Sequence, residues 1–132
     1  QEYAQGIPND VFKVMRRILP GPYTIILKAS RIIPKIMLTP RSTVGIRWPG
    51  HPIAQSIVET LGHPILSSSL RISEAELYDD PGELHDHYES QVDAVVDGGV
   101  IYAENSTIID FSGGDPVIAR RGKGGVAWLE NS

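Results

Sequence analysis

The sequence predicts an α/β protein with an open, twisted, mixed sheet, and three observations predict it. Apolar residues recur at helical spacing in some segments, whereas others are short β-branched runs such as residues 23–28 and 106–110. The two kinds of segment alternate along the chain, which is typical of a sheet with helices between its strands. The length of 132 residues, with 41% hydrophobic and 21% charged residues, suits one globular domain over residues 1–132.

Helices are predicted where apolar residues repeat every three to four positions and a cap, a glycine or a proline marks the boundary. Asn9 or Asp10 can cap the first helix, and Pro20 stops it. Gly62 closes the second helix, and Pro81 stands in the first turn of the third. In chain order the predicted helices are 11–19, 53–61 and 80–90, with a short helix or turn at 32–38 that Pro34 interrupts.

Strands are predicted at runs rich in valine, isoleucine and threonine that glycine, proline or polar residues interrupt. Pro64 leads one short, buried strand into three serines, and an Asp-Gly-Gly turn at 97–99 ends another. A turn at 112–115 joins the last two strands. In chain order the predicted strands are 23–28, 43–48, 64–66, 92–96, 106–110 and 116–120.

The net charge of −4 is unevenly distributed along the chain. Residues 1–47 carry eight Lys/Arg against two acids, whereas residues 48–115 carry one arginine against thirteen acids. Residues 116–132 return to a small excess of three Lys/Arg over one acid. This pattern is compatible with an anion-binding face built from the two ends of the chain, or with a solvated surface that has no partner. It excludes a strongly basic nucleic-acid-binding protein.

Several classes of protein are excluded by missing residues and segments. Cysteine is absent, which excludes a disulfide framework, a thiol nucleophile and a thiolate metal site. No apolar run approaches ~18 residues and no signal segment is present, so we expect a cytoplasmic protein without a membrane partner. The chain begins without an initiator methionine, a cap or a strand signal, so we expect an N-terminally truncated domain.

Candidate binding residues lie where predicted strands end, because α/β sheets hold ligands in the loops that leave strand ends. An arginine offers a planar fork for carboxylate or phosphate, and hydroxyls around such an anion can donate or accept. The alternative is that the serines terminate secondary structure and the arginines pair with nearby acids. The candidates are Arg47, Ser67 to Ser69, Ser106, Thr107 and Arg120.

Three further patterns carry weaker chemistry. His85 and His87 are two apart and would point to different faces of a helix, so no metal site is predicted. The glycine-rich residues 121–125 lack the strand–loop–Lys–Ser/Thr–helix context of a P-loop and are better read as a flexible exit from the last strand. No Gly-x-Ser-x-Gly element exists, which argues against a serine hydrolase.

The ordered set of motifs resembles the YrdC/TsaC family, and within it the YciO-like branch. The resemblance covers nearly all of the chain, and no single motif is decisive, although the whole set in this order is specific. The matching stretches are Leu19-Pro20-Gly21-Pro22-Tyr23-Thr24, Thr43-Val44-Gly45-Ile46-Arg47, His51-Pro52-Ile53-Ala54, Leu66-Ser67-Ser68-Ser69-Leu70, residues 92–99, Ser106-Thr107-Ile108-Ile109-Asp110 and Ala119-Arg120-Arg121-Gly122.

The resemblance implies a YrdC-like fold with a concave ligand-binding face and an enzymatic activity. Characterised members are nucleotidyltransferases that make L-threonylcarbamoyl-adenylate from L-threonine, bicarbonate and ATP, with release of pyrophosphate. The product is used to modify an adenosine of tRNA. ATP is therefore the expected nucleotide substrate, and Mg²⁺ the expected ion on the departing pyrophosphate.

The resemblance also implies roles for individual residues. Arg47 would hold the threonine carboxylate, with Ser69 and Ser106 orienting the ligand. Thr43, Ser67 and Arg120 would contact the nucleotide. No residue is assigned as catalytic, because attack of a carbamate oxygen on the α-phosphorus depends mainly on positioning and electrostatics.

Two departures from the family pattern bear on activity. The family's upstream Lys-x-Arg and Ser-Lys-Pro-Leu elements have no counterpart here, and these cations would face the triphosphate, so we expect this chain alone to be nearly inactive. The synthases usually show Ser-x-Asn where this chain has Ser69-Leu70-Arg71, which replaces an amide by a cation and matches the YciO-like branch.

Two other functions remain open at this stage. One is a non-catalytic RNA-binding module that uses the concave face for tRNA or double-stranded RNA; its binding would fall steeply with salt and ignore ATP. The other is a domain that handles carbamoyl-phosphate or an acyl-phosphate on the same scaffold, whose activity would need no threonine.

Overall fold

The computed structural model describes residues 2–131, which fall into two compact units. Within the described residues, unit 1 consists of residues 2–55 and 105–131, and unit 2 of residues 56–104. The sequence predicted one domain over 1–132, and that grouping stays a prediction. No helix among residues 2–131 is long and apolar enough to cross a membrane.

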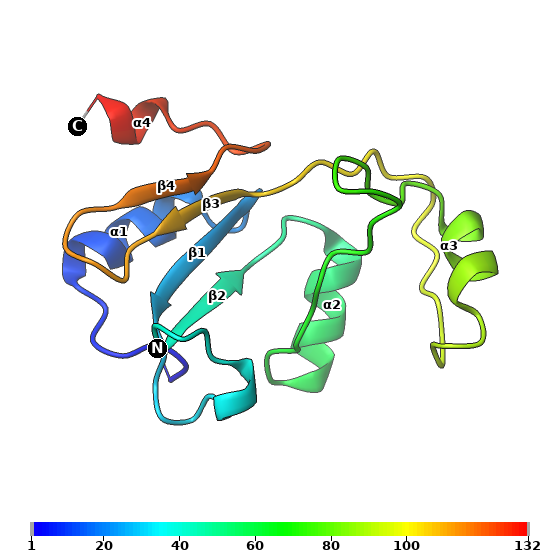
Figure 1. Ribbon diagram of the computed structural model, residues 1–132, viewed down its shortest axis with the longest axis horizontal. Helices are drawn as coiled ribbons and strands as arrows, with labels where there is room; N and C mark the ends of the chain where they lie inside the picture. The colour runs from blue at the N-terminus through cyan, green and yellow to red at the C-terminus, as the bar shows by residue number, and fades with distance from the viewer. Residues whose placement is uncertain (1, 132) are drawn as a thin grey trace. The chain divides into compact units, whose positions relative to one another are not determined.

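Unit 1 is built on a four-stranded mixed sheet with the strand order β2-β1-β3-β4 (Figure 1). β1 is central: it pairs antiparallel with β2 and parallel with β3, and β3 pairs antiparallel with β4. The predicted open, mixed α/β sheet is therefore confirmed. The strands are β1 (Tyr23–Lys28), β2 (Thr43–Arg47), β3 (Thr107–Asp110) and β4 (Val117–Arg120).

The helices also follow the sequence pattern closely, apart from one cap and one short helix that was not predicted. In the first helix no side chain caps the N-terminus, because Pro8 occupies the cap position and Asn9 is already helical. Asp80 does cap α3, since its side chain accepts a hydrogen bond from the Gly82 N–H. The helices are α1 (Asn9–Ile18), η1 (Lys35–Met37), α2 (Pro52–Leu61), α3 (Pro81–Tyr88) and α4 (Ala127–Glu130), the last of which was not predicted.

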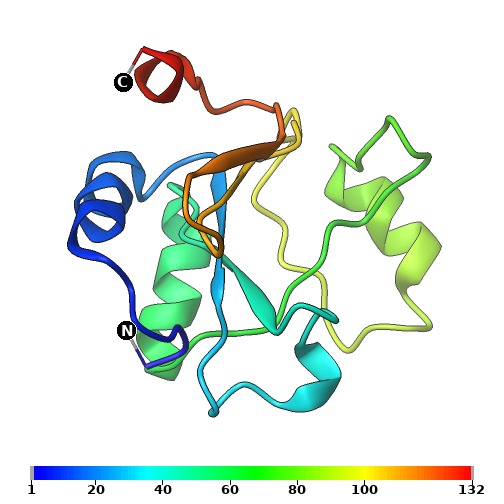
Figure 2. The same cartoon turned by 60° about the vertical axis from the view of Figure 1, so that its left-hand side comes forward.

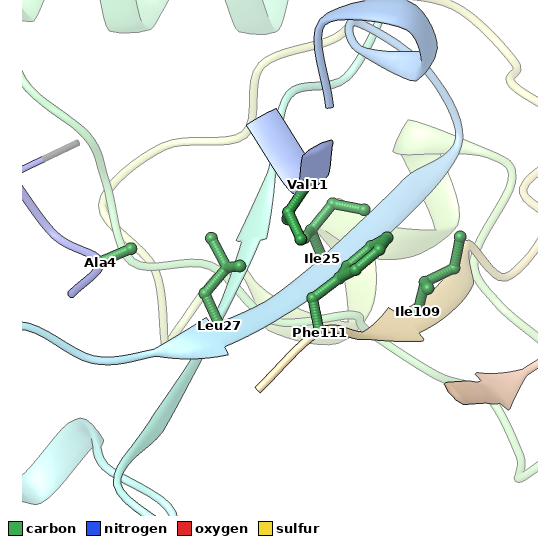
Figure 3. Packing of buried hydrophobic residues seen from close by; sticks show 6 residues of the cluster. All are labelled: Ala4, Val11, Ile25, Leu27, Ile109 and Phe111. Atoms are coloured by element: carbon green, nitrogen blue, oxygen red, sulfur yellow. The ribbon is translucent and has the colours of Figure 1, made fainter. Parts of the chain in front are cut away.

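One face of the sheet in unit 1 packs against α1, as both ribbon views show (Figures 1 and 2). Because side chains alternate along a strand, Ile25 and Leu27 of β1 point to this face together with Ile109 of β3. Figure 3 shows these residues around Val11 of α1 and Phe111, which follows β3. Burial of this cluster orients the sheet and leaves its second face for polar residues.

Two of the predicted strands are absent from unit 2. Residues 64–66 and 92–96 form no ladder, and Leu66 and Val96 are 76% and 64% exposed. A strand is stable only when its backbone N–H and C=O groups pair with a neighbour, and neither segment is paired with one in residues 2–131. Both segments are rich in apolar residues, but the strand assignment was wrong for the described chain.

Candidate anion site at one end of the sheet in unit 1

The candidate site lies on the second face of the sheet, away from α1. Thr24 of β1 and Arg47 of β2 are direct cross-strand partners, so their side chains point to this same face. Arg120 ends β4 and pairs with Ile108 of β3, which is itself the partner of Thr24. The end of β2, the start of β1, the start of β3 and the end of β4 therefore meet at one end of the sheet (Figure 1).

A chain of hydrogen bonds joins three of these residues across three strands. The Arg120 guanidinium donates from Nε and Nη2 to the Ser106 carbonyl at 3.0 and 2.8 Å, and from Nη2 to Ser106 Oγ at 3.1 Å. Ser106 Oγ in turn lies 2.7 Å from Thr24 Oγ1. Ser106 is buried, whereas Arg120 and Thr24 are partly exposed. The structure thus brings the predicted residues Ser106 and Arg120 together and adds Thr24.

Arg47 adds an exposed positive charge to this end of the sheet, where a ligand could reach it. It is exposed, and among residues 2–131 no hydrogen bond or ion pair engages its guanidinium. The alternative in which this arginine pairs with a nearby acid is therefore not seen in the described chain. Gly45, two residues earlier on β2, has no side chain to crowd the face, and a Cβ there would touch the Thr24 methyl at 3.4 Å.

Thr43 lies at the opposite end of the same sheet. It pairs with Lys28, at the other end of β1 from Thr24, and its hydroxyl lies 2.7 Å from that of Thr39. Four residues along a strand separate Thr43 from Arg47, or about 13 Å. The structure therefore does not group Thr43 with Arg120, and its role in nucleotide binding stays a prediction.

A separate cavity of about 320 Å³ opens beside Thr43. Its charged lining residues include two cations, Lys28 and Arg41, and two carboxylates, Asp110 and Asp115. Arg41 is already ion-paired with Asp110 at 3.4 Å. The two cations and two carboxylates cancel, so the lining of this cavity carries no net formal charge.

Asp110 is a structural carboxylate that the sequence analysis did not single out. Burial acts to raise its pKa, but hydrogen bonds from the Ser112 hydroxyl and backbone N–H and the charge of Arg41 outweigh burial, so the pKa is lowered. The signal for this role was present in the sequence, since an aspartate two residues before a serine at a predicted turn commonly accepts the serine's N–H.

The other predicted site residues belong to unit 2. Ser67 and Ser69 are exposed and lie in an irregular segment without secondary structure. Arg71 donates from Nη1 to the Glu74 carbonyl at 2.9 Å, within a bridge between Arg71 and Leu77. The structure shows the local conformation of these residues, and their contribution to a ligand site stays a prediction.

The glycine-rich segment 121–125 is held in place rather than flexible as predicted. The Thr107 hydroxyl donates to the Gly124 carbonyl at 2.6 Å and accepts from the Gly122 N–H at 3.0 Å. The Tyr23 hydroxyl and the Trp128 indole both donate to the Gly125 carbonyl at 2.8 Å. Tyr23 of β1 and its register partner Thr107 of β3, together with Trp128, thus hold the chain that follows β4.

No cluster in residues 2–131 places three histidine, aspartate or glutamate side chains close enough to hold a metal ion. The His85-Asp86-His87 stretch lies on α3, where the His85 ring is 3.7 Å from Asp86 and 3.9 Å from Glu89. His87 instead packs against Tyr88, with ring centroids 4.7 Å apart. The two histidines therefore have different neighbours, as their spacing suggested.

Known proteins resemble this chain in sequence. The family model for Sua5, YciO and YrdC proteins, described as "Telomere recombination", matches residues 1–122. "Uncharacterized protein YciO" of Escherichia coli K12 is 40% identical over 122 residues, which cover 91% of this chain and 59% of that protein. "Threonylcarbamoyl-AMP synthase" of Pyrococcus abyssi is 29% identical over 90% of this chain and 35% of its own length.

Solved structures resemble the chain as well. The crystal structure of E. coli YciO superposes with a TM-score of 0.89 at 39% identity, over 95% of this chain and 61% of that one. P. abyssi Sua5 complexed with L-threonine also gives a TM-score of 0.89, at 27% identity, over 99% of this chain and 39% of that one. The chain spans about three fifths of the length of its YciO relatives. On this evidence the chain belongs to the Sua5/YciO/YrdC family.

Proposed function

We propose that the protein carrying this chain is an L-threonylcarbamoyl-adenylate synthase-like nucleotidyltransferase that uses L-threonine, bicarbonate and ATP and supports tRNA modification. The observation that carries the proposal is the exposed, unengaged guanidinium of Arg47 beside the Thr24–Ser106–Arg120 hydrogen-bonded chain. Membership in a family that includes proteins named threonylcarbamoyl-AMP synthase supports it, as does the relative solved with L-threonine.

The proposed chemistry matches the groups at this end of the sheet. Arg47 binds the carboxylate of threonine, since a guanidinium is permanently charged and can donate two parallel hydrogen bonds to a carboxylate. The family resemblance assigns ligand orientation to Ser106 and to Ser69, and Ser69 belongs to unit 2 with Ser67. It assigns contact with the nucleotide to Ser67 and Arg120. Arg120 is suited to this role, because its Nε and Nη2 groups are fixed by Ser106 and its Nη1 group makes no hydrogen bond among residues 2–131.

In the proposed reaction, the amino group of threonine first forms a bond to the carbon of bicarbonate with loss of water, which gives N-carboxythreonine. A carbamate oxygen of N-carboxythreonine then forms a bond to the α-phosphorus of ATP while the bond to pyrophosphate breaks. Charge accumulates on the phosphoryl oxygens, and fixed cations stabilise it. Mg²⁺ bound through the phosphates of ATP would neutralise charge on the departing pyrophosphate.

The first test is L-threonine binding, measured by calorimetry with and without ATP on the longest natural form of the protein. Arg47→Ala should weaken threonine binding by at least about tenfold, because it removes a charged hydrogen-bond donor. Since Arg47 has no partner in the described structure, the free energy of unfolding should change by less than about 0.5 kcal/mol.

Arg31→Ala is the matched control, because Arg31 is also exposed and unengaged among residues 2–131 but follows the opposite end of β1. It should leave threonine affinity unchanged. Pyrophosphate release that needs both ATP and threonine would then establish the reaction. Nucleotide binding that threonine does not affect would contradict the proposal and point to another substrate for adenylation.

The distribution of charge over the fold favours a second candidate, an RNA-binding module. Unit 1 carries eleven Lys/Arg against five acids, whereas unit 2 carries one arginine against eleven acids. The basic residues are therefore gathered in the unit that holds the Arg47 end of the sheet. RNA binding that falls steeply between about 50 and 200 mM salt and persists in Arg47→Ala, without threonine binding, would favour this function.

A further inference from the structure

The hydrogen-bonded chain at the end of the sheet has a favoured direction, which the arginine at one end of it sets. Arg120 has no acceptor, so its Nη2 must donate to Ser106 Oγ. A hydroxyl that accepts from a cation becomes a stronger donor, because the bonds in a chain polarise one another. Of the two directions that the 2.7 Å contact between the hydroxyls allows, this polarisation favours Ser106 as the donor to Thr24 Oγ1.

This direction leaves the Thr24 hydrogen for another acceptor. Each hydroxyl has a single hydrogen, and in this direction Ser106 supplies the one shared with Thr24. Among residues 2–131, the Thr24 side chain forms no hydrogen bond other than the one with Ser106. Thr24 is partly exposed, so its donor reaches the surface of the site rather than the core.

The neighbour of Thr24 across the strands is Arg47. As direct partners in an antiparallel pair they have Cβ atoms about 5 Å apart on the same face. Asp110 of β3 is the register partner of Ile26, two residues along β1 from Thr24. Its carboxylate lies on the same face of the sheet as Thr24 but is bound by Arg41 and Ser112, toward the opposite end of the sheet. A charged donor and a polarised neutral donor thus stand side by side without an acid between them.

We propose that Thr24 is a ligand-binding residue that donates its hydroxyl hydrogen to the carboxylate held by Arg47, with Ser106 and Arg120 as positioning residues that polarise it. A carboxylate has two oxygens, and one can accept from Arg47 while the other accepts from Thr24. The inference rests on the proposed function, because it assumes a carboxylate ligand at Arg47. It differs from the family-based assignment, in which Ser106 itself orients the ligand.

The test compares three variants in L-threonine binding by calorimetry. Thr24→Val keeps the shape of the side chain but removes the hydroxyl, and it should weaken binding by about 10- to 100-fold. Thr24→Ser keeps the donor and should remain within about threefold of the unchanged protein. Ser106→Ala should have a smaller effect than Thr24→Val, because it removes the polarising group and not the contact.

Ser112→Ala is the control, since it removes a hydroxyl bonded to Asp110 at the opposite end of the sheet. It should leave threonine affinity unchanged. Unfolding by urea, followed for every variant, checks that Thr24→Val remains folded at the temperature of the binding experiment. Tight binding in Thr24→Ser with loss in Thr24→Val would show that the hydroxyl matters and that the fold is intact.

The outcomes separate this inference from the proposed function. If the unchanged protein does not bind threonine, both are overturned. If threonine binds and Arg47→Ala abolishes binding, but Thr24→Val binds normally, only the role of Thr24 is overturned. A loss in Ser106→Ala that exceeds the loss in Thr24→Val would also overturn it, because Ser106 would then be the residue that touches the ligand.

Discussion

Threonine and serine hydroxyls make most of the buried polar contacts of unit 1. Thr107 is fully buried, with 0% of its surface exposed, and Ser106 and Thr43 are buried as well. Each of the three has a hydrogen-bond partner, in keeping with the cost of leaving a buried polar group unpaired. A small hydroxyl can both donate and accept, so one side chain can tie together two segments of backbone.

Thr107 provides the clearest test of this role. In Thr107→Val the buried carbonyl of Gly124 and the N–H of Gly122 would lose their shared partner, so the free energy of unfolding should fall by about 2–4 kcal/mol. Thr107→Ser keeps the hydroxyl and loses one methyl group, which should cost about 1 kcal/mol. Urea unfolding followed by circular dichroism measures both, and equal losses in the two variants would contradict the hydrogen-bond explanation.

Asp110 gives the stability of the protein a dependence on acid pH. Its pKa is lower in the folded protein than in the unfolded chain, so the ionised form stabilises the fold. This contribution is fully present above the unfolded pKa of about 3.9 and is lost as the pH falls through the folded pKa.

The stability advantage of the unchanged protein over Asp110→Asn should therefore shrink as the pH is lowered from 5 toward 2. Urea unfolding at successive pH values measures it. Arg41→Gln should reduce the acid-dependent part, since Arg41 lies 3.4 Å from the carboxylate. An advantage that stays constant over this range would show that Asp110 acts through packing alone.

At the scale of elements, patterns within one segment were predictable from the sequence, and pairings between segments were not. The helix before Pro20, the strands at 23–28 and 43–48 and the helix with Pro81 in its first turn follow from local propensity and turn residues. The segment at 92–96 has the same strand propensity but no partner, so propensity alone could not decide its structure.

The residues of the candidate site were also predictable only in part, because some follow from the local sequence and others from the pairing of strands. The sequence indicated Arg47, Ser106 and Arg120 as residues at strand ends, and the structure brings all three to one end of the sheet. It could not indicate Thr24, because the importance of this residue comes from the register between β1, β2 and β3. It also could not reveal that Thr43 lies at the far end, since that depends on the antiparallel pairing of β1 with β2.

The segment that follows β4 passes very close to β1, and this close approach leads to a prediction about two glycines. A Cβ atom at Gly124 would fall well inside van der Waals contact with the Tyr23 ring, whereas a Cβ at Gly125 would meet no atom within 4 Å. Gly124→Ala should therefore destabilise the fold by about 1–3 kcal/mol, and Gly125→Ala should be nearly neutral. Thermal or urea unfolding compares the two, and similar stabilities would show that Tyr23 can move aside freely.

At the scale of the whole molecule, the two units differ in how well each is packed. Unit 1 contains the core cluster with the fully buried Ile25 and Ile109, whereas unit 2 exposes many of its large apolar side chains. Amide hydrogens exchange slowly only where hydrogen bonds and packing resist opening. We expect the amides of β1 and β3 to be protected and those of 64–66 and 92–96 to exchange rapidly.

Hydrogen exchange followed by mass spectrometry can measure this difference on the 132-residue chain. Rapid exchange at both 64–66 and 92–96 would agree with their irregular conformation. Protection of 92–96 comparable to that of β1 would mean that this segment forms a strand after all, as its sequence suggests. Uniformly rapid exchange in β1 and β3 would contradict the described core.

The parallel pairing of β1 with β3 also affects how the protein is made. β1 and β2 are close in sequence and can pair early, but the other neighbour of β1 is β3, which lies beyond residues 56–104. During synthesis from the N-terminus, Ile25 and Leu27 must wait for residues 107–111 to leave the ribosome before their side of the core can close. Contacts so distant in sequence raise the contact order and slow folding. A chain stopped before residue 107 would release an uncovered hairpin, which is a species prone to aggregate.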